Sequence, residues 1–364
     1  MKEEASLLFS SYIIDGVQME QTPFSALYDC LDGNGTVDIP DVAFDDIVDE
    51  YMDKAPHSFS YDPSLVREYV QKILRTPRRR MDVNYPVSST RSAINEVLLD
   101  CLFRDGHFTL QDLLLIARWD WNGAPAGNAA AFYDSALTAG GYLFDLGVRL
   151  DRYFVEKSRR DCSLEIVLRA VSSEKKGGRI LSRRACPDTM APSPRDWLVY
   201  VPFDSAKMNL GGSALSAVVG EGSGAELDQQ DPDYFIDCYE VLRELVEDRV
   251  IVAGRPVGYG GLATAAHLFK GRRGFMMDIA GIMEGAAEPD MVKTLFCEIP
   301  GVLVQIKDSD YDYFDSQMVL QDVAYYPLGH PAPDMDQIRI CRNFKDGISA
   351  ILRSLMDNAS EGED

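Results

Sequence analysis

The chain has 364 residues, and 36 Lys and Arg against 58 Asp and Glu give it a formal net charge of −22. Hydrophobic residues make up 46% and charged residues 26%, values close to the average for globular proteins, which excludes a disordered or fibrous protein. The length fits one large domain or two ordinary ones. The acidic balance repels phosphate backbones and anionic lipid surfaces, so neither nucleic acid nor a membrane is expected as a partner.

The seven cysteines are odd in number and widely scattered, and no two have the close spacing that zinc sites use. They are typical of reduced thiols. The acidic start of the chain lacks the positive region of a signal peptide, and no apolar run is long enough to span a membrane. We therefore expect a soluble, cytoplasmic protein.

The first part of the chain, residues 1–90, is acidic and linker-like. Within it, an apolar stripe predicts a short helix over 64–74, and the basic cluster at 75–80 that follows is interpreted as a solvated linker rather than an anion site. Helical periodicity then predicts helices over 91–103 and 128–146, and alternation predicts a strand over 163–171.

A stretch rich in Lys, Arg, Gly and Pro at 175–194 is the best hinge candidate. Beyond it, the patterns predict strands at 197–201, 250–253, 274–279 and 301–306 and helices at 210–219, 233–248, 262–269 and 291–296. Such alternation indicates an α/β (α+β) fold. The acids between Asp308 and Asp315 are interpreted as a solubilising loop. The expected units are an amino-terminal segment 1–90, domains 91–190 and 191–346, and an acidic tail 347–364.

One string resembles the middle of a calcium-binding EF-hand loop, in which hard oxygens alternate along the chain. Its oxygen donors would be Asp32, Asn34, Thr36, Asp38 and Asp41. In this register, however, the first position is a thiol, Cys30, and the twelfth is Asp41, which is too short to act as a bidentate Glu. A turn rich in Asp and Asn is therefore favoured over a calcium site.

Two glycine strings each precede a predicted helix. They are 210–215, which contains Gly211, Gly212 and Ser213, and 258–262, which contains Gly260 and Gly261. Free backbone amides and the helix dipole can hold a phosphate at such a place. The alternative is that these glycines only permit close packing of helices.

Seven strings from residue 197 onward stand in the order typical of the aminoimidazole ribonucleotide synthetase superfamily, and more narrowly of the second half of the phosphoribosylformylglycinamidine synthase family. They are the strand 197–201, Leu-Gly-Gly-Ser-Ala-Leu at 210–215, the helix beginning Tyr234-Phe235, Gly-Gly-Leu-Ala-Thr at 260–264, Lys-Gly-Arg-Arg-Gly at 270–274, Leu-Phe-Cys-Glu-Ile-Pro-Gly-Val at 295–302 and Pro-Leu-Gly-His at 327–330. Upstream, 92–98 and 130–147 resemble family helices, 117–125 resembles a loop that contains Asn and Trp, and 163–170 resembles a strand. The resemblance implies a synthetase-like carboxyl-terminal domain preceded by a reduced amino-terminal one.

The chain departs from the family where charged groups would act. The family pattern His-Asp-x-Ser-Asp-Gly-Gly-Leu corresponds to Gly-Arg-Pro-Val-Gly-Tyr-Gly-Gly-Leu at 254–262, and Gly-Lys-Asp-Ser has its nearest counterpart at 155–158. The resemblance thus implies a vestigial nucleotide site made of Lys157, Ser158, Gly211, Gly212, Ser213, Gly260 and Gly261. Phosphoryl transfer needs positioned cations, and the acids that would bind Mg²⁺ are missing, so no cofactor and no catalytic residue are expected.

Three functions follow as hypotheses. The first is a truncated, catalytically inactive relative of the synthase that acts as a structural or interaction protein, with protein partners or copies of itself. The alternative is one subunit of a split ATP-dependent synthase, a carbon–nitrogen ligase of purine synthesis that would use ATP and Mg²⁺. The second alternative is a calcium-binding adaptor built on 32–41.

Overall fold

The structure is a computed structural model, and it describes residues 5–33, 42–44, 47–50, 60–78, 80–171, 183–219, 224–228 and 231–342. Most of the string at 32–41 that resembles a calcium loop, and the acidic tail at 347–364, lie outside these residues. No helix among the described residues is long and apolar enough to cross a lipid bilayer.

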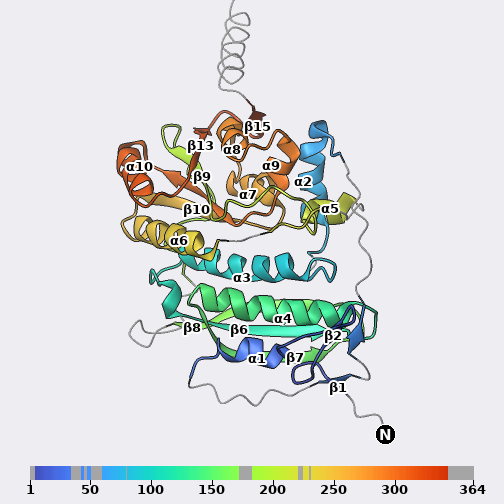
Figure 1. Cartoon of the computed structure of the whole chain (residues 1–364). Helices are drawn as coiled ribbons and strands as arrows, with labels where there is room; N and C mark the ends of the chain where they lie inside the picture. Colours follow the sequence, from blue (N-terminus) through green and yellow to red (C-terminus); the bar gives the residue numbers. More distant parts are fainter. Residues whose placement is uncertain are drawn as a thin grey trace, which may run out of the picture.

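The amino-terminal half is built around a three-stranded sheet of order β7-β6-β8 (Figure 1). Strands β6 (Leu113–Trp121) and β7 (Arg149–Lys157) are parallel and are joined through helix α4 (Asn128–Asp145), whereas β8 (Ser163–Val171) is antiparallel to β6. Every second side chain of β6, from Leu113 to Trp121, is fully buried, because alternate residues of a strand face one side of the sheet. Helix α3 (Pro86–Leu102) packs against α4.

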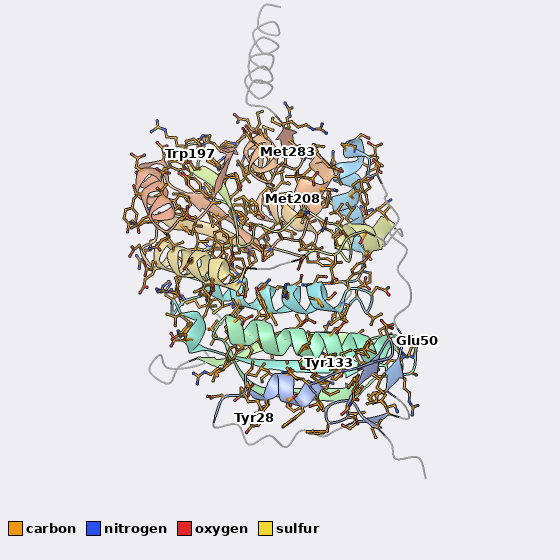
Figure 2. All side chains as sticks on the ribbon, viewed as in Figure 1. Tyr28, Glu50, Tyr133, Trp197, Met208 and Met283 are labelled. Atoms are coloured by element: carbon orange, nitrogen blue, oxygen red, sulfur yellow. The ribbon has the colours of Figure 1, made fainter. Side chains whose placement is uncertain are left out.

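Short elements of the first fifty residues pack beside this unit. Helix α1 (Pro23–Tyr28) lies on α4, and small strands accompany it. These are β1 (Ala5–Ser6) with β4 (Ala43–Phe44), and β2 (Ile13–Ile14) with β3 (Val17–Gln18) and β5 (Val48–Asp49). Tyr133, labelled in Figure 2, extends from α4 so that its ring centroid is 5.0 Å from that of Tyr12.

The carboxyl-terminal half contains a four-stranded antiparallel sheet of order β10-β12-β9-β13. Its strands are β10 (Ile251–Val257), β12 (Gly301–Ile306), β9 (Trp197–Pro202) and β13 (Tyr326–Gly329). A second sheet has the order β14-β11-β15, with β14 (Pro331–Ala332), β11 (Gly274–Asp278) and β15 (Ile338–Cys341). The helices of this half are α5 (Ala214–Val219), α6 (Pro232–Glu247), α7 (Gly261–Phe269), α8 (Ala280–Gly285), α9 (Met291–Phe296) and α10 (Tyr311–Leu320). Helix α2 (Val66–Arg75) comes earlier in the chain but packs against α5 and α7 of this half.

The four-stranded sheet separates two hydrophobic clusters. In β9, Val199 and Val201 belong to the cluster that includes α3, α4 and α6, while Leu198 and Tyr200 belong to the cluster that includes α2, α7 and α9. Both faces of β9 are therefore covered, which explains why its sequence is a continuous apolar run rather than an alternating one. Figure 1 shows α3 between α4 and this carboxyl-terminal half.

Most predicted elements have the expected type. Strand β8 and helix α9 have the predicted bounds, whereas the helix predicted over 210–219 begins only at Ala214. Two interpretations were wrong: residues 308–320 form a 3₁₀ turn, Asp308–Asp310, followed by α10, and 117–121 are the end of β6 rather than part of a loop. The unit boundaries at 90/91 and 190/191 stay predictions.

Candidate functional site

Two adjoining cavities lie between the two halves, where α3 and β8 face the beginnings of α5 and α7. Their volumes are about 520 and about 780 Å³. Both are lined by Arg78, Ser92, Glu96, Val97, Ile166, Tyr259 and Glu298. We call these two cavities together the cleft.

The two glycine strings meet at this cleft through one carboxylate. Glu298 Oε1 accepts a hydrogen bond from the Ala214 N–H, at the start of α5, at 2.8 Å and another from the Gly260 N–H, at the N-cap of α7, at 2.7 Å. Backbone N–H groups at helix beginnings are natural anion donors. In this molecule the Glu298 carboxylate, a side chain of the same chain, accepts from these N–H groups.

Gly261 shows why the second string needs its glycines. Its φ of +67° is strained for other residues, and a Cβ there would lie 2.6 Å from the Phe296 Cα. At the first string, a Cβ on Gly211 would lie 2.4 Å from the Gly224 carbonyl oxygen. Close packing, the alternative interpretation of these glycines, therefore accounts for both positions.

The Glu298 carboxyl is electrostatically unusual. Burial raises its pKa to about 7, although the two backbone N–H groups and the Arg78 guanidinium act in the opposite direction. A carboxylate that loses most of its hydration is less easily ionised, because the protein around it solvates the charge less well than water does. Near neutral pH this residue therefore carries a proton part of the time.

Arg78 connects Glu298 with the opposite wall of the cleft. Its Nη1 forms a hydrogen-bonded ion pair with Glu96 Oε1 on α3, and its guanidinium carbon is 4.7 Å from the centroid of the Tyr259 ring. Arg80 pairs with Glu165 of β8 at 3.5 Å. These two basic residues are thus engaged with acids of the amino-terminal half.

The structure brings together Gly211, Gly212 and Ser213, which line the cleft, with Gly260, whose N–H bonds to Glu298. Lys157 and Ser158 lie elsewhere, at the end of β7, and β6 separates β7 from β8, the strand that lines the cleft. The Lys157 ammonium is 4.9 Å from the centroid of the Phe44 ring, and the Ser158 N–H donates to the Trp121 carbonyl oxygen at 2.8 Å.

The stretch 254–262, where the chain lacks the acids of the resembled pattern, borders the larger cavity. Its side chains line the space without filling it. Arg255 is directed to Asp188, with Nη2 to Oδ2 at 3.1 Å, and Tyr259 is covered by Arg78.

The calcium hypothesis concerns residues that mostly lie outside those described. Of its five donors only Asp32 is described, and Asp32 Oδ1 pairs with Arg149 Nη1 at 2.9 Å. Within the described ranges, no three His, Cys, Asp or Glu side chains gather in a way that could hold a metal ion.

Sequence reasoning assigned no role to Glu298 or Glu96. It interpreted Arg78 as part of a solvated linker, whereas in the structure Arg78 lines the cleft and pairs with Glu96. Glu298 lies inside the string 295–302 that supports the resemblance, where it is a lone acid among apolar residues. That context could have marked it as a buried carboxylate. An acid at such a position usually has a buried partner, but its partners are 84 and 38 residues away and no local pattern reveals them.

Comparison with solved structures defines the class of fold. The structure of PurLQS from Thermotoga maritima matches 71% of this chain and 40% of that chain with a TM-score of 0.51 and 14% sequence identity. The fold is therefore aminoimidazole ribonucleotide synthetase-like, as the motif order predicted.

Comparison with curated sequences leads to a particular relative. The chain is similar to part of phosphoribosylformylglycinamidine synthase: the human protein is 25% identical over 237 residues, 62% of this chain, and the probable chloroplast and mitochondrial protein of Arabidopsis thaliana is 25% identical over 258 residues, 67% of this chain. The match spans 17% of the length of each of these relatives. No family model matches the chain. The resemblance to this synthase is thus confirmed for part of its length.

Proposed function

We propose that this chain is a non-catalytic relative of phosphoribosylformylglycinamidine synthase that acts as a structural or interaction protein. The observation that supports it most strongly is the position of Glu298, whose carboxylate binds the N–H groups at the beginnings of both α5 and α7. A nucleotide phosphate that approached these amides would meet a carboxylate instead of free donors.

The charges around Glu298 support the same proposal. A polyphosphate needs cations free to neutralise it. In the cleft, Arg78 is already paired with Glu96, and Arg80 with Glu165. The residues present at this place therefore do not fit a magnesium-bound nucleotide.

Isothermal titration calorimetry with ATP and Mg²⁺ tests the proposal. We expect no saturable heat at ATP concentrations up to the millimolar range, because binding would require the Glu298 carboxylate to leave two amide donors. A titration with magnesium chloride alone serves as the control. A micromolar dissociation constant for ATP would contradict the proposal.

We also propose that the chain forms a homo-oligomer through the half-exposed face of the β7-β6-β8 sheet. The second face of β6 carries Leu114 and Ile116. On β7, Phe154 is paired in register with Arg118 of the same face of β6. Leu114, Ile116 and Phe154 are only partly buried. Partly exposed apolar residues on a sheet face are typical of a surface that another protein covers.

Light scattering provides the measurement for this oligomer. We expect a mass of at least two chains for the wild type and of one chain for Ile116→Asp, because a charge at the centre of an apolar contact opposes association. Val17→Asp, at a residue that is 60% exposed in another part of the molecule, is the matched control. A monomeric wild type would refute the oligomer, and circular dichroism shows whether the variants remain folded.

The alternative, one subunit of a split ATP-dependent synthase, is favoured by a single observation, the open cleft beside Gly258. In that case a second protein would supply the missing acids and bind across the cleft. Copurification of such a protein, followed by ATP hydrolysis that depends on formylglycinamide ribonucleotide in the mixture, would support this alternative over the first proposal.

A further inference from the structure

A third cavity, of about 390 Å³, lies on the other side of α7 from the cleft. Residues Ala263, His267 and Lys270 of α7 border this cavity, whereas Thr264, Ala265 and Leu268 of the same helix border the cleft. Its remaining walls come from α2, β11 and the segment that leads into β15. The two spaces share no lining residue, so the third cavity is independent of the proposed function.

The floor of this cavity is apolar. Its apolar residues are Val66, Val70, Ala263, Met277, Ile338 and Ile340. They come from one face of α2, one face of α7 and two neighbouring parallel strands, β11 and β15. A volume of this size, with an apolar floor and polar side chains beside it, is typical of sites that hold small molecules.

Basic side chains occupy the rim. Arg67 of α2 donates to the Gln337 side-chain oxygen at 3.2 Å, and Lys270 donates to the Asp336 carbonyl oxygen at 2.9 Å. Among the residues that the structure describes, neither forms an ion pair. Asp336 is the one acid among the lining residues.

His267 of α7 lines the cavity together with these two cations. Its pKa is lowered by burial and by the nearby charges of Lys270 and Arg67. In a chain whose net charge is −22, this is a local concentration of positive charge. Hydrogen bonds to neutral oxygens satisfy the donors but leave the charge unneutralised, which favours an anion at the rim.

We propose that this cavity binds a small amphiphilic carboxylate, whose apolar body lies on the floor and whose carboxylate is held by Arg67 and Lys270. The apolar floor selects against a hydrophilic anion, and the basic rim selects against a neutral or cationic amphiphile. The other polar and charged residues that line the cavity with His267 are Ser64 before α2, Arg67 and Gln71 of α2, Lys270 of α7, and Asp336 and Gln337 before β15.

Calorimetric titration of the full chain with octanoate, compared with octylamine of the same chain length, tests this proposal. We expect saturable binding of octanoate at one site and none of octylamine. Arg67→Gln together with Lys270→Gln should weaken octanoate binding about ten-fold or more, since charge-assisted hydrogen bonds are lost. Lys307→Gln, an exposed lysine that does not line the cavity, is the matched control and should bind normally.

A second readout distinguishes this cavity from any other apolar surface. A carboxylate near His267 favours its protonated form, so octanoate should raise the pKa of His267 in an NMR titration, and His267→Asn identifies the signal. Equal binding of octanoate and octylamine, or an unchanged His267 pKa at saturation, would overturn the proposal. Binding of a short acidic peptide with no binding of octanoate would also refute a small amphiphile.

Discussion

Replacing Gly140 by Ala is expected to lower the free energy of unfolding by about 3 kcal/mol, the upper end of what overpacking a tight contact costs. A Cβ at this position would lie 2.0 Å from the Ala26 carbonyl oxygen and 2.7 Å from its carbon. These are backbone atoms of α1, so no side-chain rotation can relieve the clash. Helix α1 would have to move away from α4.

Gly141→Ala provides a matched control in the same helix. A Cβ on Gly141 has no neighbour within 4 Å, so only the better helix propensity of Ala remains, and stability should rise by up to about 1 kcal/mol. Urea unfolding followed by circular dichroism measures both variants. Equal effects of the two substitutions would contradict the close contact between α1 and α4.

Two substitutions of Glu298 are expected to change the free energy of unfolding in opposite directions: Glu298→Ala lowers it, and Glu298→Gln raises it at pH 8. Glu298→Ala leaves the N–H groups of Ala214 and Gly260 without their acceptor, and each unpaired buried donor costs about 1–3 kcal/mol, so the protein should lose about 2–6 kcal/mol of stability. Glu298→Gln keeps an acceptor oxygen and should retain both bonds.

The pH dependence separates the two roles of the Glu298 carboxyl. Its folded-state pKa of about 7 is above the ordinary value of 4.5, so the folded state binds more protons between these values. Its contribution to stability is fully present below about pH 4.5 and is lost as the pH rises through 7.

Glu298→Gln cannot ionise, and at pH 8 it should therefore be more stable than the wild type by up to about 3 kcal/mol. At pH 4.5 the two proteins should be nearly equal. Urea unfolding at both pH values provides the measurement. A wild type that is more stable than Glu298→Gln at pH 8 would show that the ionised carboxylate is not buried at a cost.

The sequence allowed elements with a strong local pattern to be predicted. Helix α9 begins after Asp290, whose carboxylate caps the Val292 N–H at 2.8 Å, and ends before the Ile-Pro that follows Glu298, so both of its ends are marked in the chain. Strand β8 was predicted because apolar and polar residues alternate at its beginning. Both signals act over a few residues, which is the range that a sequence pattern covers.

The acids between Asp308 and Asp315 were misinterpreted because charge was taken as evidence of a loop. In the structure, Asp308 and Asp310 lie in the turn before α10, and Asp312 lies in its first turn. Negative charge is stabilised there by the helix dipole. Phe314 and Met318, four residues apart, form the buried face of this helix.

The candidate site was half predictable. Gly211 and Gly260 were recognised as helix beginnings that can bind an anion, and the structure places both beside the cleft. Glu298, in the segment between α9 and β12, reaches both helix beginnings across 84 and 38 residues of chain. Contacts between such distant parts of the chain follow from the fold rather than from any short string. Lys157 was included through resemblance alone, and its strand lies beyond β6 from the cleft.

The sheet whose central strands β9 and β12 are covered on both faces has a consequence for how this chain unfolds. Val304 contributes to one hydrophobic cluster while its neighbour Leu303 contributes to the other, so neither cluster can open without exposing the back of the same sheet. We therefore expect the two clusters to unfold together in one cooperative transition. If the chain were cut so that the two clusters were separated, each fragment would expose one apolar face of the sheet to water. We expect neither fragment to fold stably alone.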